Sequence, residues 1–182
     1  AASKGRCVIG INQVAKNFSV DIAFFIDIEP FLEVGSALIN SKCAVVLPWH
    51  PNERTRFRYV SRPMKQTLLD RVSDNAVLRL LEQQGRLFYF HTNHGTIGAT
   101  SNSFAPNLVS LTSLLQILAA IDVSVVKTLG VDGGQGYSSE LSGSPLKTQL
   151  RSGYSAQFPI LRSLATQKGI IMEKAGEVDI NI

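Results

Sequence analysis

The sequence predicts an α/β fold, namely a three-layer Rossmann-like arrangement in which a mostly parallel sheet carries helices on both faces. Two observations predict it. Short apolar runs alternate with segments of helical periodicity along the 182 residues, which is typical of repeated β–α–β units. The apolar runs are also hydrophobic throughout, as strands are when both faces of their sheet are covered. We therefore expect one domain, residues 1–182, that is long enough to bury a core.

Six apolar runs are expected to form the strands. In chain order they are Cys7–Gly10, Asp21–Asp27, Lys42–Leu47, Arg86–Phe90, Val123–Val131 and Gly169–Glu173. The third run is ended by Pro48, whose missing N–H cannot join a strand ladder. The expected sheet therefore draws its strands from the whole length of the chain.

Helices are expected between these runs. They are Asn12–Asn17, Pro30–Ile39, Leu68–Gln84, Leu108–Ile121 and Ala156–Gln167. Gly85 directly follows the third and is a typical helix stop. Pro159 falls in the first turn of the last, where its missing N–H does no harm. The segments 48–65, 91–107 and 135–153 are expected to be irregular or loops.

The composition limits the partners. Hydrophobic residues make up 45% of the chain, charged residues 18%, and the net charge is +4. The positive charges are spread out apart from residues 54–65, so we expect a small phosphate-bearing ligand and no nucleic acid. Cys7 and Cys43 are expected to be buried thiols in a reducing, cytoplasmic compartment. No apolar run approaches the roughly 20 residues that span a membrane, so no integral membrane segment is expected; a homo-oligomer stays open.

The basic segment 48–65 has two interpretations. It interleaves several arginines with Trp49, Phe57 and Tyr59. It is either a solvated loop whose aromatic side chains are anchored on the core, or a lid or acceptor-binding surface for an anionic glycan. Its residues alone do not decide between the two.

Polar residues follow the expected strands at the ends that meet along one edge of a parallel sheet. Ligands of such sheets bind beyond these ends, at the point where the strand order reverses. Asn12 follows the first strand, Asp27 the second, and Asp132 the late strand that ends in TLGV. His91 and His94 open the polar loop after LFYF. Asn12 and Asp27 have an alternative interpretation as helix caps. Together these positions predict a ligand site at the carboxyl edge of the sheet.

The stretch Thr96–Ser103 precedes an expected helix and is rich in glycine and hydroxyl groups, which suits phosphate. The chain has neither a GxxxxGK[ST] loop nor a GxSxG nucleophile elbow, and its GGQG does not open a helix. His91 and His94 lack an evident third ligand, so no metal site is expected. The stretch is therefore either an anion cradle or an ordinary capped loop.

The order of the short signals VIGINQ, FID, Thr-Ser, LGVDGG and GIIME, over about residues 7–175, resembles one group of enzymes. It resembles the Rossmann-like bacterial sialyltransferases, which use a cytidine-monophosphate sugar donor. It is also similar to the related domain of flagellin-glycosylating motility accessory proteins and of archaeal pterin diphosphokinases. The resemblance implies that a nucleotide-sugar such as a CMP-sugar is bound. It implies nucleotide contacts at Asn12, Asp27, Thr100, Ser101, Gly130, Asp132, Gly133 and Tyr137.

The chain departs from this family at two places. The family's Gly-x-Gly-Pro-Ser-Leu phosphate loop would come before residue 1, so the expected domain lacks that loop and its strand. The family's catalytic histidine falls on Arg151–Tyr154, where no histidine stands; His91 or His94 would then act as the catalytic base. The sequence therefore predicts a glycosyltransferase-like protein, with a non-catalytic or degenerate nucleotide- or sugar-phosphate-binding domain as the alternative.

Overall fold

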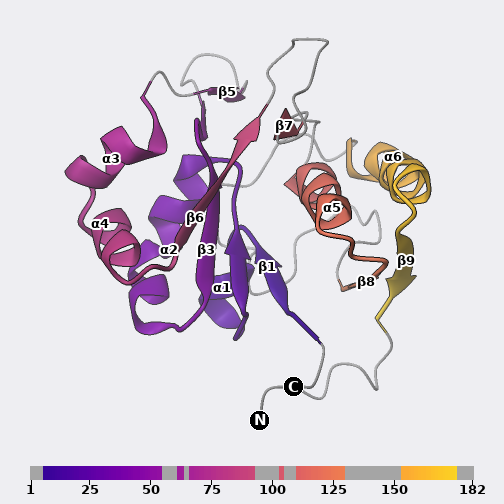
Figure 1. The fold of residues 1–182 in the computed structure, drawn as a ribbon, viewed down its shortest axis with the longest axis horizontal. Coiled ribbons are helices and arrows are strands. Elements are labelled where there is room, and N and C mark those ends of the chain that lie inside the picture. The colour runs from indigo at the N-terminus through magenta and orange to yellow at the C-terminus, as the bar shows by residue number, and fades with distance from the viewer. Residues whose placement is uncertain are drawn as a thin grey trace. The chain divides into compact units, whose positions relative to one another are not determined.

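The computed structural model describes residues 6–54, 61–63, 66–92, 103–104, 110–129 and 153–175. The chain forms two compact units, Ala1–Pro106 (unit 1) and Asn107–Ile182 (unit 2). Figure 1 labels their helices and strands. The arrangement is α/β and Rossmann-like with a mostly parallel sheet, which confirms the predicted fold class. That both units form a single domain stays a prediction.

Unit 1 is built on a five-stranded sheet in the order β1-β2-β3-β6-β7. Its strands are β1 (Ile9–Ile11), β2 (Ile22–Phe24), β3 (Ala44–Pro48), β6 (Leu87–Thr92) and β7 (Ser103–Phe104). Every neighbouring pair is parallel. These five strands follow one another across the sheet in chain order, so their order never reverses. Their carboxyl ends therefore form one continuous edge.

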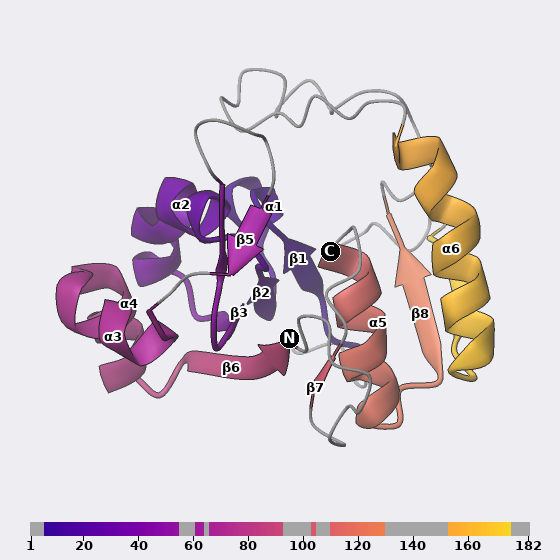
Figure 2. The ribbon, with the colours of Figure 1, turned by 90° about the horizontal axis from the view of Figure 1, so that it is seen from above.

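The helices of unit 1 cross between these strands. They are α1 (Val14–Asn17), α2 (Ile28–Asn40), α3 (Leu68–Asp74) and α4 (Ala76–Gln83). Right-handed crossovers between strands in sequential order place helices on the same face of a sheet. Figure 2 shows α2, α3 and α4 on one side of the strands.

The core of unit 1 lies between that face and the helices. The strand register aligns Ala23, Val45 and Leu87 across β2, β3 and β6. The side chains of this face pack against α2–α4 in one buried cluster; among its members are Phe25, Phe31, Val34, Leu38, Leu47, Leu68, Leu78 and Leu81. The Phe25 and Phe31 rings meet edge to face, with 5.7 Å between their centroids. This core holds the strand ends in fixed relative positions.

Arg86 ties the amino end of β6 to the end of α2. Its guanidinium donates to the carbonyl oxygens of Leu38 at 2.7 Å and Cys43 at 3.0 Å, and to Ser41 Oγ at 3.1 Å. The last carbonyls of a helix have no partner within it. A cation there also interacts favourably with the helix dipole. Arg86 therefore caps α2 from a residue far away in the sequence.

Unit 2 contains a two-stranded parallel sheet of its own. Its elements are α5 (Ser110–Ala120), β8 (Val125–Thr128), α6 (Gly153–Gln167) and β9 (Ile171–Lys174). β8 pairs with β9, and α5 packs on α6. α5 is buried over consecutive residues, Leu111–Leu115, as its apolar spacing predicted.

Three helices end in the same way. Gly85, Asp122 and Gly169 follow α4, α5 and α6 and adopt φ of 65°, 58° and 71°. The next N–H in each case returns to a carbonyl five residues earlier: Arg86 to Leu81, Val123 to Leu118, and Ile170 to Ala165, at 2.8–2.9 Å. This is the Schellman motif. It confirms Gly85 as a helix stop.

Three sequence predictions about local structure were wrong. The expected helix Leu68–Gln84 is two helices, because Asn75 is extended and its side chain caps α4. Residues 48–65 contain the antiparallel strands β4 (Asn52–Arg54) and β5 (Ser61–Pro63). Pro159 lies inside α6, which begins three residues earlier than predicted. Pro48 is the last residue of β3, in line with the prediction that it ends the strand.

Cys7 also differs from its prediction. Its side chain is exposed, whereas Cys43 is buried as expected, and both are free thiols. Cys7 precedes the edge strand β1 and so lies outside the core. Partial burial, followed by the negative charge of Asp21, raises the pKa of the Cys7 thiol.

Candidate functional site

The carboxyl edge of the unit 1 sheet gathers polar and aromatic residues from four adjacent strands. Asn12 directly follows β1, and Asp27 comes three residues after β2. Trp49 and His50 follow β3, and His91 lies at the end of β6. Adjacent strands are about 4.8 Å apart, so the edge from β1 to β6 spans about 14 Å. That length suits a nucleotide better than a single sugar ring.

Asn12 combines a left-handed backbone conformation with a side-chain oxygen that has no hydrogen-bond partner among the described residues. Its φ is 55°, a left-handed conformation that asparagine tolerates better than most residues. Its backbone N–H donates to the Phe24 carbonyl at 2.9 Å. Its side-chain Oδ1 is buried and has no hydrogen-bond partner in the part of the chain that the structure describes. A ligand donor would satisfy this oxygen.

His50 offers a second unsatisfied atom at the same edge. Its Nδ1 is buried and has no hydrogen-bond partner among the described residues. A buried polar atom without a partner costs about 1–3 kcal/mol. Asn12 and His50 follow the first and third strands of the sheet, which lie on either side of β2. The sequence analysis did not select His50 for this site.

Asp27 occupies the N-cap position of α2. Its backbone is extended, with φ −95° and ψ 146°, but its side chain makes no hydrogen bond to the first turn of the helix. The alternative interpretation of Asp27 as a side-chain cap is therefore not supported. Asp27 brings a carboxylate to the end of β2, between Asn12 and His50.

Three aromatic rings cluster at the ends of β3 and β6. The centroid of the Trp49 ring lies 4.7 Å from that of Tyr89 and 5.8 Å from that of His91. Tyr89 and His91 meet edge to face at 6.1 Å. Tyr89 is 52% exposed, and His91 is exposed as well. We call Trp49, Tyr89 and His91 the aromatic cluster.

The backbone holds the aromatic cluster in place. The Trp49 N–H donates to the Phe90 carbonyl, and the Trp49 carbonyl accepts from the Leu68 N–H, each at 2.7 Å. Tyr89 and His91 are two residues apart on β6, so their side chains point to the same face of the sheet. This two-residue spacing was the sequence signal that could have identified Tyr89, which was not predicted.

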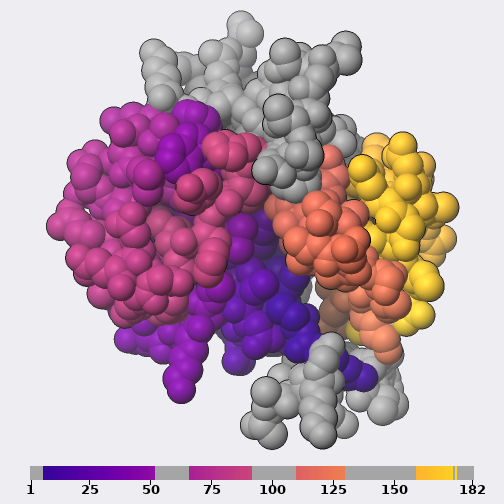
Figure 3. Space-filling view, viewed as in Figure 1, coloured from indigo at the N-terminus to yellow at the C-terminus, as the bar shows by residue number. Residues whose placement is uncertain are grey.

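The start of α3 adjoins this edge. Thr67 and Asp70 form a reciprocal capping box: Asp70 N–H donates to Thr67 Oγ1, and Thr67 N–H donates to Asp70 Oδ2 at 2.8 Å. The Thr67 hydroxyl also donates to Asp70 Oδ2 at 2.7 Å. These bonds, with a smaller contribution from His50, hold the pKa of Asp70 below its usual value. Figure 3 shows α3 and α4, in magenta, at the surface of unit 1.

The remaining predicted site residues lie outside the described residues. They are His94, Thr100, Ser101, Gly130, Asp132, Gly133 and Tyr137. Their roles stay predictions. Of the predicted site, the structure thus places Asn12, Asp27 and His91 along one edge of one sheet.

The described residues contain no group of three or more histidines, cysteines or acids that could hold a metal ion. Among them, no helix combines the length and the apolar character needed to cross a membrane.

Comparison of the chain with protein-family models, with curated proteins and with solved structures gave no match. The functional argument therefore depends on the residues of the site itself.

Proposed function

We propose that the protein is glycosyltransferase-like and binds a nucleotide-activated sugar at the carboxyl edge of the unit 1 sheet. One observation carries the proposal. Asn12, Asp27, His50 and the aromatic cluster stand at the carboxyl ends of four adjacent parallel strands, and two buried polar atoms among them have no hydrogen-bond partner among the described residues. Parallel α/β sheets bind their ligands beyond the carboxyl ends of their strands, typically where the strand order reverses. The described strands of unit 1 do not reverse their order, so the proposal depends on the residues at this edge. The sequence resemblance favours a nucleotide-sugar as that ligand.

Each described residue has a distinct part in this proposal. Asn12 Oδ1 accepts a hydrogen bond from an amino or hydroxyl group of the nucleotide. The exposed Tyr89 of the aromatic cluster stacks on the base, since every base presents a π-face to an aromatic ring. Asp27 accepts hydrogen bonds from sugar hydroxyls. Binding in this way would position the donor for transfer.

The transfer step needs a base near the acceptor hydroxyl. In the proposed step, the acceptor oxygen attacks the anomeric carbon and the bond from that carbon to the donor phosphate breaks. The nucleotide phosphate leaves with the electron pair, and His91 takes the proton of the acceptor hydroxyl. Histidine suits this role because its usual pKa is near neutrality.

A second function is supported by the contacts of His91. Its ring packs against Trp49 and Tyr89, which is a structural role in the aromatic cluster. The alternative is therefore a non-catalytic or degenerate domain that binds a nucleotide or sugar phosphate at the same edge without transferring it.

A melting scan with cytidine, uridine, guanosine and adenosine nucleotides, with and without magnesium, tests the proposal. A ligand that binds only the folded protein raises Tm by mass action. We expect one base to raise Tm, and His91→Gln to keep that shift. If the wild-type protein hydrolyses the nucleotide-sugar that carries the same base, and His91→Gln does not, the result supports the transferase. If the nucleotide raises Tm but the nucleotide-sugar is not hydrolysed, the result supports the non-catalytic binding domain. A folded protein that no nucleotide stabilises would contradict both.

A further inference from the structure

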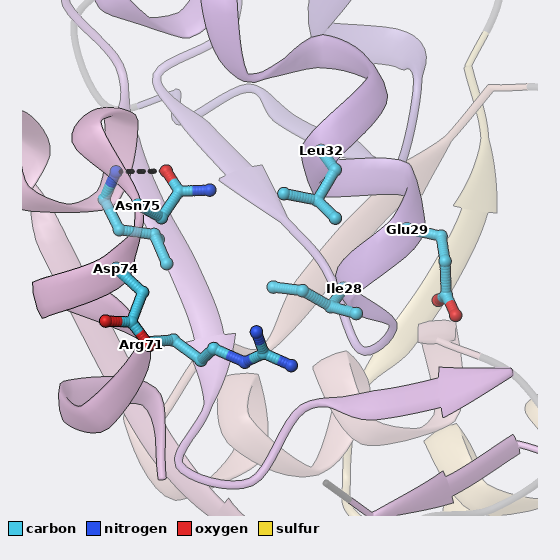
Figure 4. Close-up of a pocket in the computed structure, with 7 residues that line it drawn as sticks. Ile28, Glu29, Leu32, Arg71, Asp74 and Asn75 are labelled. Atoms are coloured by element: carbon cyan, nitrogen blue, oxygen red, sulfur yellow. Dashed lines mark hydrogen bonds between the residues drawn. The ribbon is translucent and has the colours of Figure 1, made fainter. Parts of the chain in front are cut away.

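A small cavity of about 170 Å³ lies between the first turn of α2 and the corner where α3 meets α4. Its apolar wall is formed by Ile28, Leu32 and Leu78. Figure 4 shows Ile28 and Leu32 facing the side chains of Arg71 and Asn75 across this space. None of the residues that line the cavity is among those assigned to nucleotide binding.

Arg71 brings an unsatisfied donor to the cavity. Its Nε is buried and has no hydrogen-bond partner among the described residues. Figure 4 shows its guanidinium reaching from α3 toward Ile28 of α2. A buried N–H of a charged group without an acceptor is costly. The cavity in front of it has room for that acceptor.

Asn75 supplies a second donor with a fixed direction. Its Oδ1 accepts from the N–H groups of Val77 and Leu78, both at 3.0 Å, and so caps α4. Because the oxygen is held by the helix, the amide nitrogen must point the other way. In Figure 4 it points across the cavity toward Leu32.

The two acids of the cavity lining are directed elsewhere. Asp74 Oδ1 accepts from the hydroxyl of Ser73 at 3.2 Å, and Figure 4 shows its carboxylate beside the base of the Arg71 side chain, away from α2. The carboxylate of Glu29 lies beyond Ile28, on the side away from Arg71. Both acids are nevertheless close enough to disfavour a ligand of high negative charge. A monoanion fits this lining better than a phosphate dianion.

We propose that this cavity binds a small carboxylic acid with a short apolar body. The carboxylate pairs with the Arg71 guanidinium, which matches it in geometry, and accepts from the Asn75 amide. The apolar body lies against Ile28, Leu32 and Leu78. This inference does not depend on the proposed nucleotide site.

The direct test is a titration followed by NMR of the arginine Nε–H groups in ¹⁵N-labelled protein, with Arg71→Lys used to assign the Arg71 signal. The probes are acetate, propionate, butyrate and inorganic phosphate at constant ionic strength. We expect a saturable shift of the Arg71 signal with each carboxylate. The affinity should rise by about fourfold per added methylene while the cavity accommodates it. Phosphate should bind more weakly than butyrate.

Two variants separate the site from general charge effects. Asn75→Asp keeps an oxygen for the α4 cap, since aspartate caps helices well, but removes the amide donor; butyrate should bind at least tenfold more weakly. Arg79→Met is the matched control for Arg71→Met. Arg79 is exposed on α4, its guanidinium donates to the Ser73 carbonyl, and it does not line the cavity. Butyrate binding, followed by the shift of an amide in α4, should be lost in Arg71→Met and kept in Arg79→Met.

The proposal is overturned by any of three results. The first is an Arg71 signal that does not respond saturably to any carboxylate in the folded wild-type protein. The second is an equal response to phosphate and butyrate, which would indicate charge screening alone. The third is unchanged butyrate affinity in Asn75→Asp.

Discussion

Replacing Asn12 with glycine separates a binding role from a structural one. Asn12 has φ 55°, and its buried Oδ1 has no hydrogen-bond partner among the described residues. Glycine adopts this φ without strain, which removes roughly 1 kcal/mol of backbone cost. It also removes the unsatisfied oxygen, worth about 1–3 kcal/mol. The extra freedom of glycine in the unfolded chain costs about 0.5–1 kcal/mol. We therefore expect Asn12→Gly to raise the free energy of unfolding by about 1–3.5 kcal/mol.

The same substitution should weaken nucleotide binding. One hydrogen bond contributes about 1–1.5 kcal/mol, so the nucleotide Kd should rise about tenfold. At a nucleotide concentration of 100 times the wild-type Kd, ligand stabilisation is about 2.7 kcal/mol. In Asn12→Gly it should fall to about 1.4 kcal/mol by the same relation. The protein becomes more stable without ligand and gains less from it.

Urea unfolding with and without nucleotide measures both quantities in one series. Asn17→Gly is the matched control, because Asn17 is an exposed residue at the end of the short helix α1. It should lower the free energy of unfolding slightly and leave the ligand effect unchanged. The reasoning is refuted if Asn12→Gly destabilises the protein and keeps the full nucleotide effect, since Asn12 would then be a structural residue.

Four further substitutions test other features of the structure. Asp122→Gly should raise the free energy of unfolding by about 0.5 kcal/mol, and Gly169→Ala should lower it by about 1 kcal/mol. Both positions have a left-handed φ, and no atom lies within 4 Å of a Cβ at Gly169; thermal unfolding measures both. Asp70→Asn should destabilise the protein at neutral pH. Because the folded pKa of Asp70 is lowered from 3.8, the difference from wild type should shrink as pH falls below about 4; a gap independent of pH in urea unfolding would contradict the capping box. Cys7 should react with iodoacetamide at pH 8 more slowly than a free cysteine, because its pKa is raised by burial and by Asp21. Asp21→Asn should speed that reaction, and an unchanged rate would show that the charge of Asp21 is unimportant.

The sheet of unit 1 was largely predictable because its strands come from continuous apolar runs. The residues of β1, β2 and β3 and residues 87–90 of β6 are apolar, and continuous apolar runs between helical segments predict parallel strands. The positions of Asn12, Asp27 and His91 followed from the strand ends alone. Site residues that directly follow a strand are therefore visible in the sequence.

Features that depend on contacts between distant residues were missed. The sequence does not reveal that the predicted helix is interrupted at Asn75, because the helical spacing of apolar residues continues on both sides of it. The polar triplet Ser73, Asp74 and Asn75 is the local signal for a helix end at this point. Tyr89 looked like a core residue, but β6 leaves its side chain half exposed beside Trp49. The cavity at Arg71 exists only because α2 and α3 come together, which no local pattern encodes.

The most direct test of the nucleotide site uses Trp49, the single tryptophan of the chain. It lies in the aromatic cluster, so its fluorescence reports on the carboxyl edge of unit 1 without a label. The nucleotide-binding proposal predicts a saturable fluorescence change on titration with the nucleotide that raises Tm, and a roughly tenfold higher midpoint in Asn12→Gly. Fluorescence that stays unchanged at nucleotide concentrations that raise Tm would place the ligand elsewhere and contradict the proposed site.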